Sequence, residues 1–123
     1  MAGVLVVEDD HAVGALMCEA LVDGGFLVEC VGNDHDAYAR ISSLPTLGAL
    51  VLDVNLGAGT TGYDVARFAR LVIPDIAVIY VSGEVPASSF KAFGAPESTF
   101  VQKPFTPADL VAAVTRKLGA CSG

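Results

Sequence analysis

The residues best suited to chemistry stand directly after apolar segments of the sequence. Carboxylates follow two of these segments, at Glu8 and Asp9 and at Asp53, a hydroxyl follows another at Ser82, and an amine follows the last at Lys103. The segments have the composition of buried strands, and an open parallel sheet forms its ligand crevice at the carboxyl ends of its strands. We therefore expect these side chains to share one polar pocket.

A pocket with several carboxylates requires a cation. Two unit charges about 4 Å apart repel by about 4 kcal/mol at an effective dielectric constant of about 20. The expected ligands are all oxygens, which favours Mg²⁺, with Mn²⁺ as the alternative. A carboxylate flanked by a metal ion, the ammonium of Lys103 and the hydroxyl of Ser82 is equipped to attack phosphorus and form an aspartyl phosphate. Phosphoryl transfer depends chiefly on such positioning and charge neutralisation.

The elements that must position these residues alternate along the chain. Short apolar runs rich in β-branched residues are followed by segments of helical periodicity, and the pattern occurs five times. This predicts a single α/β domain, a (βα)5 parallel sheet with right-handed crossovers and helices on both faces. The strands are expected at 4–7, 26–31, 47–53, 76–81 and 99–102.

The expected helices end at Gly24, Pro45, Pro74 and Gly119, and a short further helix is expected over 86–93. Thr106 is the expected N-cap of the last helix. The glycine-rich segment 57–62 lacks the Lys-Ser/Thr of a P-loop and is predicted to be a flexible loop. The residues expected to face the core share helical spacing: Val13, Leu16, Met17, Ala20 and Leu21; Ala37, Ile41 and Leu44; Val65, Phe68, Ala69 and Val72; and Leu110, Ala113, Val114 and Leu118.

Composition narrows the function classes. The chain has 123 residues, of which 53% are hydrophobic, and a formal net charge of −7 with only seven Lys and Arg. We expect one domain over 1–123, with a core over 4–118 and a tail over 119–123. The negative charge argues against direct nucleic-acid binding. No apolar run approaches the roughly eighteen residues of a membrane span, and no signal segment begins the chain.

The cysteines fit neither a disulfide framework nor a zinc site. Cys18, Cys30 and Cys121 are odd in number and lack CxxC spacing. We expect free thiols in a reducing cytoplasm.

The motifs together resemble the receiver domain of two-component response regulators, and in particular chemotaxis-type receivers. The motif residues are 6–10 (VVEDD), 52–55 (LDVN), 81–83 (VSG) and 103–105 (KPF). Their order and separation also fit that family, and the resemblance extends from Val4 to Leu118. It implies a flavodoxin-like doubly wound sheet with strand order 2-1-3-4-5.

The resemblance also implies a role for each residue of the pocket. Asp53 would be the phosphoacceptor, and Lys103 would bind the phosphoryl group through a cis bond to Pro104. Asp9 would be a direct Mg²⁺ ligand together with Asp53, and Glu8 would act nearby or through water. Asn55 would offer its backbone carbonyl to the metal.

Further residues would control the signal. Ser82 and Phe100 would be the switch pair, while Asn55 and Glu84 would modulate the loss of phosphate. Phosphorylation would reshape the face formed by the fourth helix, fifth strand and fifth helix.

The partner implied by the resemblance is a histidine kinase or histidine phosphotransfer protein. Downstream, the partner would be a target protein or a second copy in a phosphorylation-dependent homodimer. The chain would be a signalling switch rather than an enzyme, either stand-alone or part of a longer hybrid protein. Two other classes remain open. One is a phosphohydrolase with an aspartyl-phosphate intermediate, although Asn55 stands where its second Asp would be. The other is a docking module or flavodoxin relative.

Overall fold

A five-stranded parallel sheet forms the centre of the molecule, with strand order β2-β1-β3-β4-β5. The computed structural model describes all residues except 1–2, 45, 55–61, 84–96 and 123. The predicted fold class and strand order are confirmed. The strands are β1 (Gly3–Val7), β2 (Leu27–Val31), β3 (Leu47–Asp53), β4 (Ala77–Ser82) and β5 (Thr99–Gln102), and the described helices are α1 (His11–Asp23), α2 (Asp34–Ser43), α3 (Gly62–Val72) and α5 (Pro107–Ser122).

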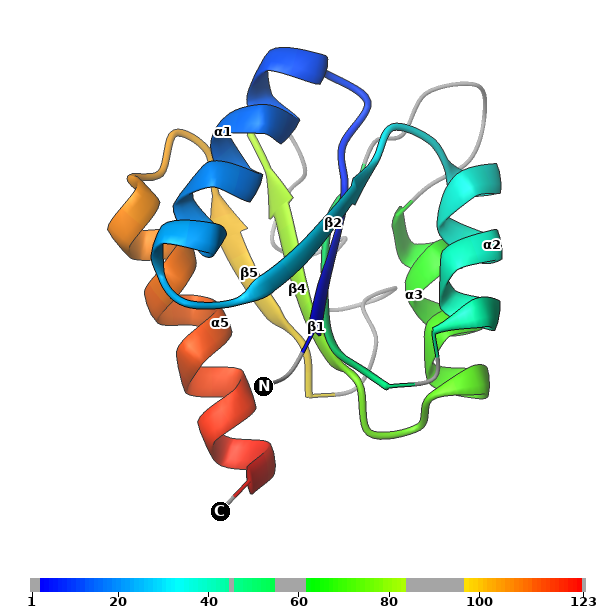
Figure 1. Cartoon of the computed structure of the whole chain (residues 1–123). Coiled ribbons are helices and arrows are strands. Elements are labelled where there is room, and N and C mark those ends of the chain that lie inside the picture. Colours follow the sequence, from blue (N-terminus) through cyan, green and yellow to red (C-terminus); the bar gives the residue numbers. More distant parts are fainter. Residues whose placement is uncertain (1–2, 45, 55–61, 84–96, 123) are drawn as a thin grey trace.

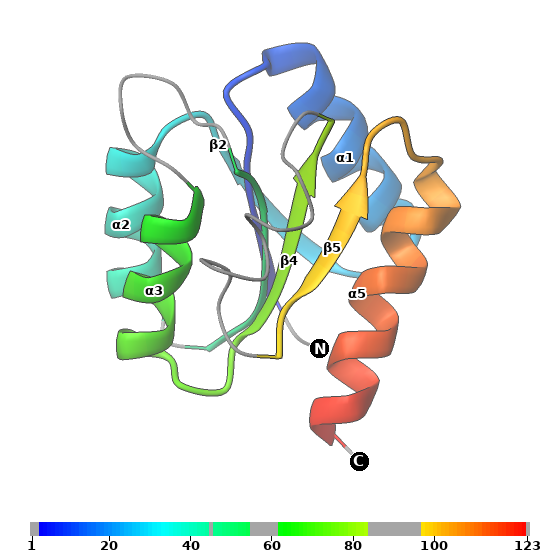
Figure 2. The ribbon, with the colours of Figure 1, turned by 180° about the vertical axis from the view of Figure 1, so that it is seen from behind.

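Helices cover both faces of the sheet. α1 and α5 lie on one face and α2 and α3 on the other, as the two opposite views show (Figures 1 and 2). Each pair of helices packs on its own apolar core, one on either side of the sheet. Every residue of β4 is buried, which explains why this strand is a continuous apolar run rather than an alternating pattern.

Side-chain caps fix where the helices begin. The carboxylate of Asp10 accepts a hydrogen bond from the backbone N–H of Val13 at 3.1 Å, which caps α1. Thr106 and Asp109 cap α5 reciprocally, each side chain accepting from the other residue's backbone N–H at 3.1 and 3.0 Å. Because these bonds satisfy donors that the helix itself cannot, they define the turns leading out of β1 and β5.

Several expectations from the sequence were wrong in detail. Leu16 is 67% exposed, because it lies at the margin of the buried face that Met17 and Leu21 define on α1. Val72 is 40% exposed at the end of α3. α5 continues through Gly119 to Ser122 instead of ending there, since a glycine inside a helix costs only about 1 kcal/mol. The predicted tail over 119–123 is therefore helical as far as Ser122.

Other differences are small. β2 begins one residue later than predicted and β4 is displaced by one residue, whereas β3 and β5 have the predicted bounds. The short helix predicted over 86–93 lies outside the described residues. Within the described part of the chain, no helix combines the length and apolar character needed to cross a membrane.

Candidate functional site

The register of the sheet brings the predicted site residues to one edge. Glu8 follows the residue of β1 that pairs with Leu52, so it stands beside Asp53. Ser82 follows the partner of Asp53 on β4, and Lys103 follows the partner of Ser82 on β5. Side chains that are far apart in sequence therefore meet at the carboxyl ends of four of the strands.

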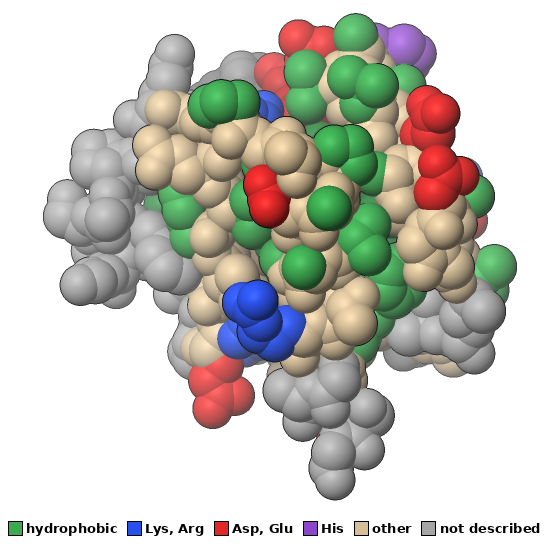
Figure 3. All heavy atoms as spheres, turned by 90° about the vertical axis from the view of Figure 1, so that its left-hand side faces the viewer, with side chains coloured by type: hydrophobic (Ala, Val, Ile, Leu, Met, Phe, Trp, Pro, Cys, Tyr) green, Lys and Arg blue, Asp and Glu red, His purple; other side chains and the backbone are tan. Residues whose placement is uncertain are grey.

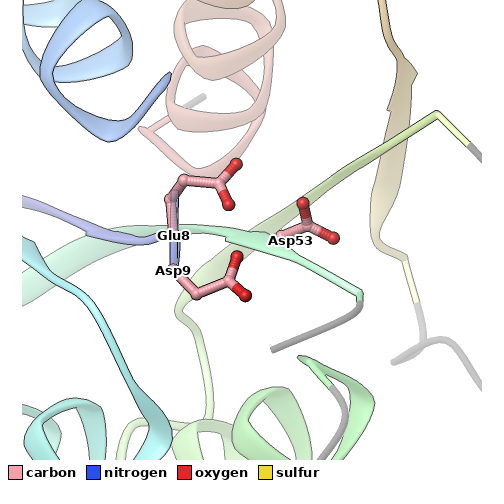
Figure 4. A group of neighbouring side chains, drawn as sticks. All are labelled: Glu8, Asp9 and Asp53. Atoms are coloured by element: carbon pink, nitrogen blue, oxygen red, sulfur yellow. The ribbon is translucent and has the colours of Figure 1, made fainter. Parts of the chain in front are cut away.

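Three carboxylates form a tight cluster at this edge. One oxygen each from Glu8, Asp9 and Asp53 lies within 4.8 Å of the others. In Figure 4, the carboxylates of Glu8 and Asp9 extend from the end of β1 toward Asp53 at the end of β3. Glu8 and Asp53 are buried, whereas Asp9 is exposed and lies at the mouth of the cluster.

Lys103 bridges two of these carboxylates. Its Nζ lies 2.8 Å from Oε1 of Glu8 and 2.8 Å from Oδ2 of Asp53. The Glu8 side chain is only 1% exposed, so the ammonium replaces much of the solvation that this carboxylate loses on folding. Three carboxylates face one ammonium, and the cluster keeps an excess of negative charge.

Burial and mutual repulsion perturb the ionisable groups of the cluster. The pKa of Glu8 is raised above its usual value, chiefly by burial and also by Asp9 and Asp53, although the hydrogen bond from Lys103 opposes this. Burial alone would lower the pKa of Lys103, but its hydrogen bonds to Asp53 and Glu8 outweigh that effect and raise it. Lys103 is therefore a permanent cation at neutral pH.

The donor set fits a hard divalent cation. All three candidate ligands offer oxygen, and a second cation would offset the excess negative charge. Both oxygens of Glu8 already accept hydrogen bonds, one from Lys103 and one from the backbone N–H of Asp10 at 3.3 Å. Glu8 thus suits a place beside a metal ion, and Asp9 and Asp53 suit direct coordination.

Of the remaining predicted site residues, Ser82, Phe100 and Pro104 lie in the described part of the chain, whereas Asn55 and Glu84 do not. Ser82 is 2% exposed, and its carbonyl accepts the backbone N–H of Lys103 at 3.0 Å. Phe100 lies opposite Tyr80 in the sheet, partly buried against the core on the side of α2 and α3. The Lys103–Pro104 peptide bond is cis.

Gly62 supports the site in a way that the sequence did not reveal. It is the first residue of α3, and its backbone N–H donates to the carbonyl of Val54 at 2.6 Å. A Cβ at this position would overlap the backbone carbonyl oxygen of Asp53. The only sequence signal was the glycine-rich segment 57–62, which was predicted to be a flexible loop. That prediction is wrong for Gly62, which begins α3, and residues 57–61 lie outside the described part of the chain.

Comparison with known proteins identifies the family. The sequence model of the response regulator receiver domain matches residues 4–115. This chain belongs to that family. It is 27% identical to the response regulator receiver protein CpdR of Brucella abortus (strain 2308), over 96% of this chain and 98% of CpdR. It is 32% identical to the regulatory protein VirG of Agrobacterium tumefaciens (strain 15955), over 90% of this chain but only 41% of VirG.

A solved structure agrees with this assignment. The crystal structure of a response regulator receiver protein from Sinorhizobium medicae WSM419 superposes with a TM-score of 0.92 at 31% identity, covering 98% of this chain and 96% of that one. The chain is therefore a receiver domain of two-component signal transduction. This favours the receiver over the phosphohydrolase and flavodoxin alternatives.

Proposed function

We propose that this receiver domain accepts a phosphoryl group on Asp53 from a phosphohistidine donor in a Mg²⁺-dependent reaction. The observation that carries the proposal is the position of the Lys103 ammonium, 2.8 Å from a carboxylate oxygen of Asp53 inside a cluster of three carboxylates. Lys103 contacts two buried carboxylates, and the Asp53 side chain is the more accessible of the two, at 11% exposed against 1% for Glu8, so Asp53 is better placed to act as the nucleophile.

The transfer is a displacement at phosphorus. A carboxylate oxygen of Asp53 attacks the phosphorus atom, the bond between phosphorus and the donor imidazole nitrogen breaks, and the imidazole leaves with the bonding electrons. Lys103 neutralises charge on the phosphoryl oxygens, and the hydroxyl of Ser82 donates a hydrogen bond to one of them. Mg²⁺, when bound, supplies further neutralisation of the phosphoryl charge.

Four residues would hold the metal ion. Asp9 and Asp53 would be direct ligands, and Asn55 would contribute its backbone carbonyl. Glu8 would act through water, because both of its oxygens are engaged by Lys103 and the Asp10 N–H.

The phosphorylated state would be transmitted by a switch. Ser82 would move toward the phosphate, and the ring of Phe100 would turn with it. These movements would shift the equilibrium between two conformations of the face to which β5 and α5 contribute. Asn55 and Glu84 would modulate the attack of water on the phosphate. A downstream target protein or a second copy of the chain would bind this face.

A cytoplasmic location, expected from the sequence, stays a prediction.

An apolar groove beside the pocket suits the phosphodonor. It has a volume of about 460 Å³ and lies between α1 and the start of α5, where Lys103 lines it together with Leu16, Phe105 and Leu110. Figure 3 shows hydrophobic side chains gathered over this face. Because the donor imidazole must reach Asp53, a histidine kinase or phosphotransfer protein has to cover the adjoining surface. Exposed Leu16 would be one of its contacts.

Labelling by a small acyl phosphate tests the assignment of Asp53. With Mg²⁺ present, the wild type should gain one phosphoryl group, about 80 Da by mass spectrometry, and Asp53→Asn should gain none. Asp64→Asn, which changes an exposed carboxylate on α3, is the matched control and should label like the wild type. Equal labelling of Asp53→Asn and the wild type would contradict the proposal.

A further inference from the structure

Two of the cysteines meet at a place that their spacing in the sequence does not reveal. Cys18 lies on α1 and Cys30 on β2, and both line a cavity of about 220 Å³ that Glu8 also lines. α1 packs against β2, which is an edge strand of the sheet (Figure 1). The two residues therefore approach each other from neighbouring elements.

The Cys30 thiol reaches α1 at Gly14, one helical turn before Cys18. The pKa of Cys18 is raised to about 12, first by burial and then by the neighbouring Cys30. The Cys30 sulfur also lies 3.8 Å from the carbonyl oxygen of Gly14, to which its thiol donates. A Cβ on Gly14 would come within 3.4 Å of that sulfur, so the glycine leaves room for the sulfur between helix and strand.

A structural metal site is a poorer explanation for this pair. Structural zinc takes four ligands, whereas two thiols supply two. Among the described residues, the only group of three or more acidic, His or Cys side chains placed to hold a metal ion is Glu8, Asp9 and Asp53. Glu8 and His11 also line the cavity, but neither forms such a group with the two sulfurs, which are therefore better suited to covalent bonding with each other.

We propose that Cys18 and Cys30 are a redox modification site, at which a reversible disulfide links α1 to the edge strand β2. The oxidant is a small-molecule disulfide of the glutathione type. The Cys30 thiolate attacks one sulfur of the oxidant, the oxidant's S–S bond breaks, and one thiolate leaves. Cys18 then loses its proton to water and attacks the Cys30 sulfur, which releases the second thiolate. Two protein thiols are oxidised, and one disulfide molecule is reduced to two thiols.

Exposure assigns the order of these steps. Cys30 is exposed on the edge strand and can meet a solute, whereas Cys18 is partly buried. Burial keeps Cys18 in its thiol form, so it is a poor first nucleophile and acts as the resolving cysteine.

The disulfide should also stabilise the folded protein. It closes the short loop between the two residues and so restricts the unfolded chain, and it should raise the melting temperature by about 5–10 °C.

Titration with oxidised glutathione tests the proposal on the full chain carrying Cys121→Ser, which removes the third thiol. The two remaining thiols should disappear together, the protein should become about 2 Da lighter, and dithiothreitol should restore both thiols. Peptide mapping should find Cys18 joined to Cys30 within one chain. Adding Cys18→Ser should instead trap a stable glutathione adduct of about 305 Da on Cys30.

Three outcomes would overturn the proposed disulfide. Both thiols could stay reduced in oxidised glutathione, a glutathione adduct on Cys30 could persist although Cys18 is present, or disulfides could form only between chains. Because the reduced Cys121→Ser protein is itself the test molecule, a folding defect in the Cys18→Ser variant does not affect these readouts. The inference is independent of the phosphoacceptor role of Asp53, and either can fail alone.

Discussion

Lys103 touches two carboxylates at once, and this sets the charge that the pocket offers to a cation or phosphoryl group. With the ammonium in place, Glu8 and Asp53 share one positive charge at 2.8 Å each. Without it, two buried carboxylates would face each other beside Asp9. The same residue would thus stabilise the unphosphorylated pocket and be available to bind the phosphoryl oxygens.

Replacing Lys103 by Met should destabilise the protein even in the absence of any phosphodonor. We expect the free energy of unfolding to fall by about 2–3 kcal/mol, because the buried Glu8 carboxylate loses its partner. Urea denaturation at neutral pH without Mg²⁺ measures this. Arg67→Met is the control, since Arg67 pairs with Asp64 at 3.8 Å on the surface and should cost less than about 1 kcal/mol. Equal losses in the two variants would show that burial of the Lys103 pair is unimportant.

At the scale of elements, the start of α3 positions Asp53, the proposed phosphoacceptor. Gly62, the first residue of α3, packs directly against the backbone of Asp53 and Val54 at the end of β3. This close approach requires a residue without a side chain. The first turn of α3 therefore acts as a support for the strand end from which Asp53 extends.

Gly62→Ala should disturb both stability and phosphorylation. The added methyl group meets backbone atoms that cannot rotate away, so we expect a loss of about 1–3 kcal/mol in the free energy of unfolding and slower labelling of Asp53 by an acyl phosphate. Gly32→Ala is the control, because its nearest neighbour would be the Glu8 carbonyl at an ordinary 3.8 Å. Wild-type stability and labelling in Gly62→Ala would refute the close contact.

Across the whole molecule, the two helical faces have different surfaces. The α1 and α5 face carries the apolar groove next to the pocket, and Leu16 is exposed on it. Leu71 is also exposed, at 82%, but on α3 at the opposite face. A donor that must reach Asp53 across the groove should depend on the first face only.

Leu16→Asp should slow phosphotransfer from a histidine kinase that phosphorylates the wild type, by about tenfold if one buried apolar contact is lost. Its labelling by a small acyl phosphate should be unchanged, because the pocket is intact. Leu71→Asp is the matched control and should leave both reactions unchanged. The docking assignment fails if the two variants slow the kinase reaction equally.

The sequence by itself determined the parallel sheet and most of the pocket, and its resemblance to receiver domains implied the strand order. Apolar runs that are buried on both faces specify parallel strands, and polar residues directly after them must meet at one edge. Glu8, Asp9, Asp53, Ser82 and Lys103 were therefore predictable as neighbours.

Tertiary structure alone decided which of these neighbours touch and how other residues support them. The Lys103 bridge between Glu8 and Asp53, and the contact of Gly62 with Asp53, depend on distances that spacing along the chain does not encode. The meeting of Cys18 with Cys30 depends on how a helix packs against an edge strand, and their twelve-residue separation matched no motif. Local periodicity fixes which face an element buries, and packing then fixes the pairwise contacts.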